Sequence, residues 1–343
     1  MMRRGVSLLE VMISMGVIAI GLAGVIAILP VALYHIGRGT VLDNASRVGL
    51  NAVEEFDLRG MGRPLQWRYR TNLLPDPATA RNGWATAFAI DPWFIANNSS
   101  DANAEEFPYG TTTSVPRMVR VSLRSSPSGT PSIMGSAQAE EIFVSQDELV
   151  FDLPLDRTQP PTQVFGAGTA RRQYEGTISW MATVAPVYSS ADRDLYTLSV
   201  VVFHNRAVTD TAAERVVDVR DFLANGLSGG DITLQGASPD DLELQAGNWI
   251  MLMDFISSGV PFFRWYRVVA TEESARISGA SWQREVTLHG ADWPSSLVQS
   301  TTTFWGTTPP PAGYVPTRAA IVGNVVAVYE KTIRLETGNL WEF

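Results

Sequence analysis

One acidic residue, Glu10, stands at the start of a long apolar segment, and its chemistry most needs an explanation. From Val11 to Leu33 no side chain carries a charge. A carboxylate in hydrocarbon costs roughly 2.5–3.5 kcal/mol on insertion scales, so acids in such segments are usually retained for a function. Glu10 is therefore the first candidate for a functional residue, and charge pairing is its expected chemistry.

The histidines and the glycine-rich segments offer weaker signals. His35, His204 and His289 are far apart in the sequence and lack the spacing of metal ligands. The segment FGAGTARR (165–172) contains GxG, but it has neither the third glycine nor the amphipathic helix that a phosphate-binding loop requires. Core or surface histidines and a flexible loop account for these patterns better than metal or nucleotide binding.

A calcium loop is the best metal candidate, and it departs from the known pattern. Asp101, Asn103 and Glu105 alternate as calcium ligands do, within NNSSDANAEE (97–106). An EF-hand loop requires Gly at its sixth position and Glu at its twelfth, where this chain has Glu106 and Thr112. We expect a solvated loop here, and we predict no metal site, no cofactor and no catalytic residues. The protein is accordingly not expected to be an enzyme.

Composition narrows the class of protein further. The chain has 343 residues, of which 45% are hydrophobic, so it is long and apolar enough for one large or two modest folded domains. Its net charge of −9 argues against a nucleic-acid partner, because phosphate contacts need clustered Lys and Arg. The absence of cysteine excludes disulfides and thiolate chemistry.

The N-terminal segment has the length of a membrane span. About 20 apolar residues in a helix cross a bilayer, and the run 11–33 meets that length. Arg3 and Arg4 precede the run, so the positive-inside rule keeps the N-terminus in the cytoplasm. A cleaved secretory signal would have a shorter apolar region of 7–15 residues. A twin-arginine signal would be less hydrophobic, and a plain signal anchor leaves Glu10 unexplained.

The sequence RRGVSLLEV around Glu10 resembles the processing site of type IV prepilins and type II secretion pseudopilins. The shared features are a short basic leader, Gly5 before the cleavage point, an apolar segment after it, and Glu as the fifth mature residue. Within this family the segment is most similar to minor pilins of the PilV kind and to I-type pseudopilins. The resemblance implies cleavage between Gly5 and Val6 by a prepilin peptidase, followed by N-methylation of Val6.

Two residues depart from the commonest pattern of that family. The first mature residue is usually Phe or Met, whereas this chain has Val6. Major pilins carry a helix-kinking proline a few residues earlier than Pro30. Pro30 can still remove a backbone hydrogen bond and loosen the preceding turn of the helix, so we expect a kink there.

The resemblance also implies a role for Glu10. In the family, this carboxylate is thought to meet the N-terminal ammonium of a neighbouring subunit during filament assembly. Burying one of these charges without the other costs several kcal/mol, so pairing would favour insertion at a defined stagger. A contact within one helix, from the Val6 amine to Glu10 at i,i+4, is an alternative that does not exclude the first.

The helix is expected to continue beyond the membrane. Apolar residues recur at helical spacing from Val41 to Phe56, with polar residues between them, and Gly60, Gly62 and Pro64 follow. The sequence thus predicts a leader at 1–5 and one helix over 6–58, with the membrane span at about 11–33. In the half of this helix beyond the membrane, the outer half, the apolar residues Val41, Ala45, Val48, Ala52 and Phe56 form one stripe along the helix surface.

The remainder of the chain has the pattern of β-structure. Alternating or clustered β-branched and aromatic residues predict strands at 117–123, 141–153, 176–188 and 195–204. We expect an antiparallel, pilin-like β head over 59–208, packed on the amphipathic half of the helix, and an accessory β-rich module over 209–343, either a barrel or a sandwich. The fold class is therefore α+β. The six tryptophans of the last 95 residues either fill the core of this module or form a recognition surface, for carbohydrate or another ligand.

Taken with the resemblance, these patterns predict a structural filament subunit, a minor pilin or pseudopilin. Its expected partners are other pilin or pseudopilin subunits, the prepilin peptidase/N-methyltransferase, the inner-membrane assembly platform and the lipid bilayer. It would cross the bacterial inner membrane once, with a periplasmic head, and then enter a periplasmic or extracellular filament. The alternative is a signal-anchored periplasmic β-domain enzyme or ligand-binding protein. The sequence does not choose between a pilus and a secretion pseudopilus, or between a tip and a shaft position.

Overall fold

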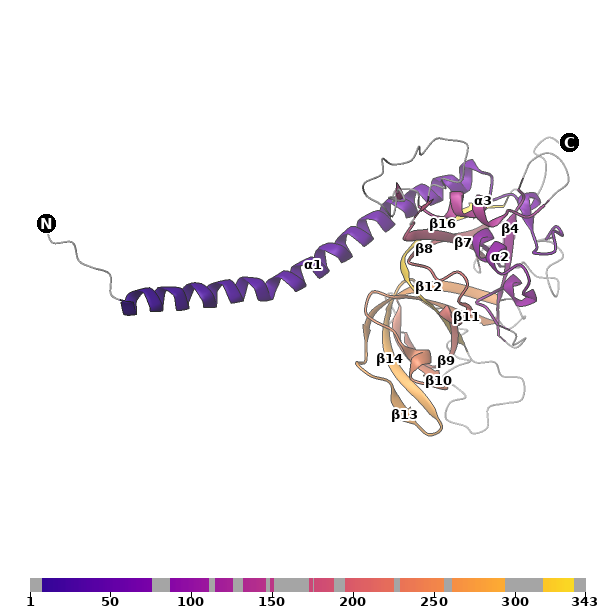
Figure 1. Ribbon diagram of the computed structural model, residues 1–343. Helices are drawn as coiled ribbons and strands as arrows, with labels where there is room; N and C mark the ends of the chain where they lie inside the picture. The colour runs from indigo at the N-terminus through magenta and orange to yellow at the C-terminus, as the bar shows by residue number, and fades with distance from the viewer. Residues whose placement is uncertain are drawn as a thin grey trace, which may run out of the picture. The chain divides into compact units, whose positions relative to one another are not determined.

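The computed structural model describes one long helix and two β-sheets that carry most of the core (Figure 1). The description covers residues 8–75, 87–110, 115–125, 132–145, 149–150, 173–174, 176–187, 195–224, 229–255, 261–293 and 317–335. The chain divides into two compact units, Met1–Asn44 and Ala45–Phe343.

The first element is a single helix, α1, which spans Leu8–Leu58. Its end at Leu58 agrees with the sequence prediction, and Gly60 follows in the left-handed region with φ of 63°. Glycine reaches this conformation without steric cost, which is why it commonly ends helices. Pro30 lies inside α1 and does not terminate it. The segment FGAGTARR and the leader lie outside the described residues.

The first sheet holds seven strands in the order β1-β4-β2-β7-β8-β16, with β3 paired to β4. All pairs are antiparallel except β2 with β4, which are parallel. Strands predicted at 117–123, 176–188 and 195–204 are confirmed as β4, β7 and β8. The bounds are β1 Trp67–Arg68, β2 Phe88–Ile90, β3 Glu106–Phe107, β4 Met118–Leu123, β7 Ile178–Pro186, β8 Leu195–His204 and β16 Val325–Arg334.

The strand predicted over 141–153 is wrong in its first residues. Glu141 to Phe143 close a helix, α3 (Ser136–Phe143), because Ala139 and Phe143 are four residues apart and both are buried on one helix face. A two-stranded ribbon contains β5 (Leu149–Val150) and β6 (Gln173–Tyr174). The other short elements are α2 Pro92–Asn97 and the 3₁₀ turns η1 Pro64–Gln66, η2 Ala102–Glu105, η3 Thr211–Ala213 and η4 Asp240–Leu242.

The second sheet closes on itself as a six-stranded antiparallel barrel. Its order is β10-β9-β15-β11-β12-β14, and β10 also pairs with β14, which completes the ring, while β13 extends β14 as a hairpin. The accessory module is therefore the barrel that the sequence analysis gave as one of two options. The bounds are β9 Glu214–Ala224, β10 Gly230–Gly236, β11 Trp249–Phe255, β12 Pro261–Thr271, β13 Arg276–Ser278, β14 Ser281–His289 and β15 Arg318–Val322.

The last strand departs from the expected division at residue 208. β16 leaves the barrel and pairs with β8 along its whole length, so the first sheet is completed by the end of the chain. The backbone N–H of His204 donates to the carbonyl of Asn324 at 2.9 Å, which places the two connections side by side. The barrel is thus inserted between two neighbouring strands of the first sheet, and only the part before β16 forms the separate β module.

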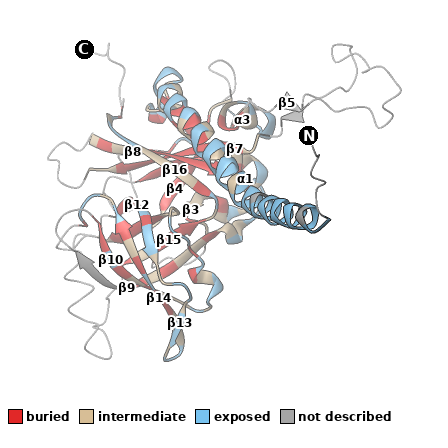
Figure 2. Cartoon of the chain, turned by 90° about the vertical axis from the view of Figure 1, so that its left-hand side faces the viewer, coloured by how far each residue is buried: buried red, intermediate tan, exposed pale blue. Residues whose placement is uncertain are grey.

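The first sheet is buried on both faces, and most residues of its strands are coloured as buried in Figure 2. One face packs against the outer half of α1 and against α3, through a core that includes Phe56, Trp180 and Val200. The opposite face packs on the outside of the barrel, with residues such as Phe203 and Met251 in one shared core. The barrel has its own interior, which is filled by side chains that include Leu234, Tyr266 and Trp293.

One carboxylate at the end of a barrel strand is buried without an ion pair among the described residues. Asp254 is 2% exposed, and its carboxylate accepts hydrogen bonds from the Thr317 hydroxyl and from the backbone N–H of Phe255 at 2.7 Å. Burial outweighs these bonds and raises the pKa of Asp254 to about 6. Folding therefore favours the protonated form of this side chain.

This gives the barrel a pH-dependent stability. Because the folded pKa lies above the unfolded value near 3.9, the free energy of unfolding should fall as pH rises from about 4 to about 6, by up to roughly 2–3 kcal/mol. Asp254→Asn can keep both contacts, because its amide oxygen accepts from the Phe255 N–H and its NH2 group donates to the Thr317 hydroxyl. This variant should flatten the pH dependence and stabilise the protein at pH 7. Denaturant unfolding of the detergent-solubilised full-length protein measures both, with the exposed Asp292→Asn as control. Parallel pH profiles for wild type and Asp254→Asn would contradict the assignment.

Candidate functional site

The residues that the sequence analysis assigned to processing and assembly lie at the start of the chain. Gly5 and Val6 fall outside the described residues. Glu10 lies in the first turn of α1, where the structure describes its backbone only. Pro30 lies 20 positions after Glu10 on the same helix. One continuous helix therefore carries both Glu10 and Pro30.

The first part of α1 exposes an apolar surface along its described length. Each large apolar side chain from Leu8 to Ile36 whose exposure is described is at least 44% exposed. Among the described residues, α1 is the one helix that is long and apolar enough to cross a membrane. An apolar surface of this extent is stable in lipid or against other apolar helices and is not stable in water. The length and composition of this part of α1 are those of a membrane anchor.

The outer part of α1 is docked on the first sheet by small side chains. Ala45 and Ala52 are 0% and 1% exposed, and Phe56 fills the space at the end of the helix. A Cβ placed on Gly49 would lie 2.1 Å from the Tyr329 ring of β16, so only glycine allows this approach. Four residues of the predicted stripe, Ala45, Val48, Ala52 and Phe56, are confirmed as buried in the core.

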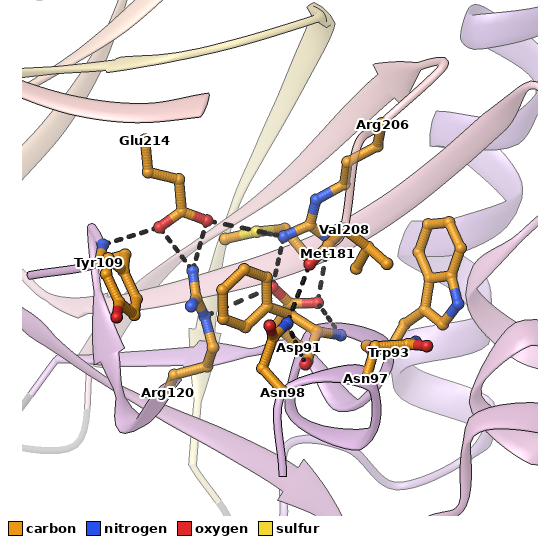
Figure 3. A network of polar contacts seen from close by, with 11 residues as sticks. Asp91, Trp93, Asn97, Asn98, Tyr109, Arg120, Met181, Arg206, Val208 and Glu214 are labelled. Atoms are coloured by element: carbon orange, nitrogen blue, oxygen red, sulfur yellow. Dashed lines mark hydrogen bonds and ion pairs between the residues drawn. The ribbon is translucent and has the colours of Figure 1, made fainter. Parts of the chain in front are cut away.

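A cluster of four charged side chains lies where the barrel meets the first sheet (Figure 3). Arg120 comes from β4, Asp91 from the residue before α2, Arg206 from the segment after β8, and Glu214 from the first residue of β9. All four are strongly buried, and Arg120 and Asp91 are both 0% exposed. Arg120 projects toward the barrel because its neighbours in β4, Val119 and Val121, belong to the core on the helix side.

The four groups alternate in sign and form a closed ring of ion pairs. Arg120 Nη2 donates to both carboxylate oxygens of Glu214, at 2.6 and 2.7 Å, and Arg120 Nε lies 3.4 Å from Asp91 Oδ2. Arg206 donates to both oxygens of Asp91, at 3.0 and 2.5 Å, and lies 3.8 Å from Glu214 Oε1. The backbone N–H of Tyr109 adds a bond to Glu214 at 2.8 Å. Two positive and two negative charges leave the ring neutral.

Aromatic rings and hydrogen bonds complete the surroundings of the two arginines. The Arg120 guanidinium lies 3.7 Å from the centroid of the Phe94 ring and 5.1 Å from that of Phe107, as in a cation–π contact. Burial alone would raise the pKa of Asp91, but the charge and hydrogen bonds of Arg206, helped by Arg120, hold it below its usual range. Asp91 is thus ionised throughout the physiological pH range.

This cluster can join two parts of the chain, but it is not suited to catalysis. Its carboxylates are occupied by guanidinium and backbone donors, and the side chains are shut off from solvent. A general base needs access to substrate and a pKa near the working pH, and neither condition is met by Asp91. Because Glu214 belongs to the barrel and Arg120 to the first sheet, the cluster fixes how these two parts pack.

The candidate metal residues are used for local structure. Asp101 caps η2 by accepting from the backbone N–H of Asn103 at 2.9 Å, and it accepts from the Tyr109 hydroxyl at 2.5 Å. Glu105 lies 4.0 Å from the Arg70 guanidinium. His35, His204 and His289 lie on α1, at the end of β8 and at the end of β14. In the ranges that the structure describes, no group of three or more His, Cys, Asp or Glu could hold a metal ion.

Comparison with known families identifies the N-terminal segment. Residues 1–26 match the family model of the prokaryotic N-terminal methylation motif. The N-terminal segment is therefore of the type IV pilin-like or pseudopilin kind. No curated protein and no solved structure was found to be similar to the chain. The motif implies processing by a prepilin peptidase and assembly with other pilin subunits, and the pilin family that carries this motif is structural.

The four residues of the charged cluster were not foreseen from the sequence of this pilin-like protein. Arg120 is the one usable signal, because it is the only charged residue in the strand MVRVSL, stands between two valines and must find a buried partner there. Its partners Asp91 and Glu214 lie 29 and 94 positions away from Arg120 in the sequence. No local sequence pattern connects these three residues. Their juxtaposition follows from the packing of the barrel on the sheet.

Neutralising Glu214, the barrel residue of the ion-pair ring, should destabilise the folded protein. Glu214→Gln removes one negative charge and leaves two buried guanidinium groups with Asp91 alone, so the free energy of unfolding should fall by about 3–5 kcal/mol. The matched control is Glu285→Gln, which loses an exposed pair with Arg276 and should cost less than about 1 kcal/mol. Denaturant unfolding of the full-length pilin-like protein measures both values.

A double-mutant cycle tests whether the cost comes from the unpaired charge. Adding Arg120→Met to Glu214→Gln removes the stranded guanidinium and should recover part of the lost stability, with a coupling energy of about 1–3 kcal/mol. Additive losses in the double variant, or a loss for Glu214→Gln no greater than for Glu285→Gln, would show that the ring does not join the two parts.

Proposed function

We propose that the protein is a minor pilin or pseudopilin, a structural subunit of a type IV pilus or of a type II secretion filament. The observation that carries this proposal is the methylation motif at residues 1–26, continuous with one helix over Leu8–Leu58. The first part of this helix is apolar and exposed, and its outer part is built into the core of a β head. An anchor that continues into the core of a head in this way suits a subunit that is drawn from the membrane into a fibre.

Processing is the first step of the proposed pathway. The leader 1–5 would remain in the cytoplasm, held by Arg3 and Arg4, and the peptidase would cut between Gly5 and Val6. The new amine at Val6 would then be methylated. The helix would cross the inner membrane once, with the β head in the periplasm, before the assembly platform adds the subunit to a periplasmic or extracellular filament.

Glu10 would direct assembly through charge pairing. Cleavage creates a positive amine four residues before Glu10, near the end of a segment with no other charge up to Leu33. Each of these charges is costly in an apolar setting when it is alone, and a pair across two subunits removes much of that cost. The subunit would therefore be most stable at the stagger that brings its Glu10 to the amine of its neighbour.

The inserted barrel favours a minor over a major subunit. It covers the face of the first sheet that the helix leaves uncovered, through a shared core. A head enlarged in this way would crowd a dense helical array in which every subunit is identical. We therefore divide the chain into a leader at 1–5, a helix at 6–58, a pilin-like head that begins at 59 and is completed by β16, and an inserted barrel between β8 and β16.

The proposal predicts the mature N-terminus. In cells that contain a prepilin peptidase, the purified protein should begin at Val6, and intact-mass spectrometry should show loss of residues 1–5 with one added methyl group. Gly5→Leu should leave the leader attached, because the residue before the cut must be small. A wild-type protein that still begins at Met1 or Met2 in such cells would argue for a plain signal anchor.

The role of Glu10 predicts a separable assembly defect. Glu10→Gln keeps the size of the side chain and removes its charge, so processing and membrane insertion should persist while recovery in sheared filaments falls at least about tenfold. Glu54→Gln is the matched control, since it neutralises an exposed acid on the outer half of the same helix. Quantitative blotting of the filament and membrane fractions measures the ratio. Wild-type incorporation of Glu10→Gln would refute the pairing role.

A further inference from the structure

The barrel-facing side of the first sheet changes from apolar to polar along β8, and β7 adds one hydroxyl between two apolar residues of that face. On β8, Phe203 and Val201 belong to the core shared with the barrel, and Ser199 and Thr197 continue the same face. On β7, Met181 in that core is followed on the same face by Thr183. Trp265 of the barrel marks the change, because its indole N–H donates to the Thr183 hydroxyl at 3.2 Å.

A pocket of about 260 Å³ opens at this polar end. The first sheet contributes hydroxyl groups and a carboxylate, and strand β12 of the barrel contributes a guanidinium and aromatic rings, so neither part forms the pocket alone. The residues of the wall that the argument uses are Thr183, Thr197, Ser199, Phe262, Arg264 and Glu330.

Arg264 and Glu330 are the two charged residues of the pocket, and in the described part of the chain they do not form an ion pair with each other. Arg264 donates from Nη1 to the backbone carbonyl of Asp292 at 2.7 Å, and its guanidinium lies 5.3 Å from the centroid of the Phe262 ring. Glu330 is approached by the Ser199 hydroxyl at 3.5 Å. Loss of hydration around its carboxyl raises the pKa of Glu330. Glu330 is an exposed residue of β16, so a ligand that donates hydrogen bonds can reach its carboxylate.

We propose that this pocket binds a small, neutral, polyhydroxylated ligand, a single sugar ring at the end of a glycan or free in solution. The wall carries one positive group, Arg264, and one negative group, Glu330, so its charges balance, and a neutral ligand meets neither with a like charge. Sugar hydroxyls both donate and accept, as the Thr and Ser hydroxyls of the wall do, and can satisfy the carboxylate and the guanidinium together. Pro186 and Val187, which also line the pocket and are partly exposed, provide apolar surface for the C–H groups of the ring.

The size of the pocket and its number of polar groups favour a sugar over a zwitterion. Its volume lies just below the roughly 300–1,000 Å³ of pockets for drug-sized ligands, so one ring is the largest unit that it can enclose. A free amino acid would match Arg264 and Glu330 with its two charged ends, but it has no further polar group for the hydroxyl of Thr197. This inference rests on residues of the head and the barrel and does not depend on the processing of the N-terminus.

Binding of defined glycosides tests the proposal. The full-length protein, in a detergent without a sugar headgroup, would be titrated with the methyl glycosides of glucose, galactose, mannose and N-acetylglucosamine by calorimetry and by saturation-transfer NMR. At least one should bind saturably. Glu330→Gln and Thr197→Val preserve the shape of the wall and should each weaken that binding about tenfold, the usual effect of losing a hydrogen bond to a charged or buried partner.

Control variants establish whether the sugar binds in this pocket or elsewhere on the protein. Glu273→Gln neutralises an exposed carboxylate of the barrel outside the pocket and should leave sugar binding unchanged. Thermal unfolding and near-UV circular dichroism should show that Glu330→Gln and Thr197→Val remain folded. The proposal is overturned if none of the four glycosides binds saturably, if both pocket variants bind as wild type does, or if glycine or alanine binds more tightly than every glycoside.

Discussion

A β-sheet that is apolar on both faces must be covered twice, and this requirement organises the protein from Ala45 onward. The two central strands, β7 and β8, are buried along nearly their whole length. One face is covered by the outer half of α1 with α3, and the other by the outside of a closed barrel. Each cover removes large apolar side chains from water, at about 25 cal/mol for each Å² of apolar surface. Neither the helix nor the barrel is therefore an appendage to a sheet that could stand alone.

The contact between sheet and barrel is divided by chemistry across the sheet. At β4, the buried Arg120 meets Glu214 of the barrel, and the ring of ion pairs completed by Asp91 and Arg206 neutralises both charges. At the centre, apolar residues of β7 and β8 pack on Met251 and Met253 of β11. Beyond this apolar centre, where β8 carries Ser199 and Thr197 and β16 carries Glu330, hydroxyl and carboxylate groups line a pocket between the two parts. A buried ion ring adds little net stability but penalises any packing in which its members are unpaired. It therefore selects one orientation of the barrel, and that orientation creates the pocket.

The sequence predicted those features that local patterns encode. The methylation motif, the helix end at Leu58 and the strands β4, β7 and β8 follow from spacing, periodicity and turn residues. Strand β9 was missed because Asp218, Arg220 and Asp221 interrupt its apolar residues, and the start of the 141–153 strand was wrong because α3 buries Ala139 and Phe143 on one face. The return of β16 to the first sheet and the ring around Arg120 were also missed. Both depend on contacts between distant segments, for which the sequence has no local sign.

The place of the insertion explains how a head of this type can carry a barrel without losing its sheet. β8 and β16 are antiparallel neighbours, so the chain leaves β8 and returns to β16 at the same edge, where His204 and Asn324 are hydrogen-bonded. Asn205 and Asn324 both adopt the left-handed conformation, which asparagine tolerates better than most residues and which tight hairpin turns require. A short turn could join the two strands with the same pairing, and the barrel replaces that turn. Because β16 also presents Tyr329 to Gly49 of α1, the strand that follows the barrel is one of those against which the helix docks. Complete docking of the outer half of α1 therefore needs β16 in the sheet, which makes this half of the helix, the sheet and the inserted module parts of one folded unit.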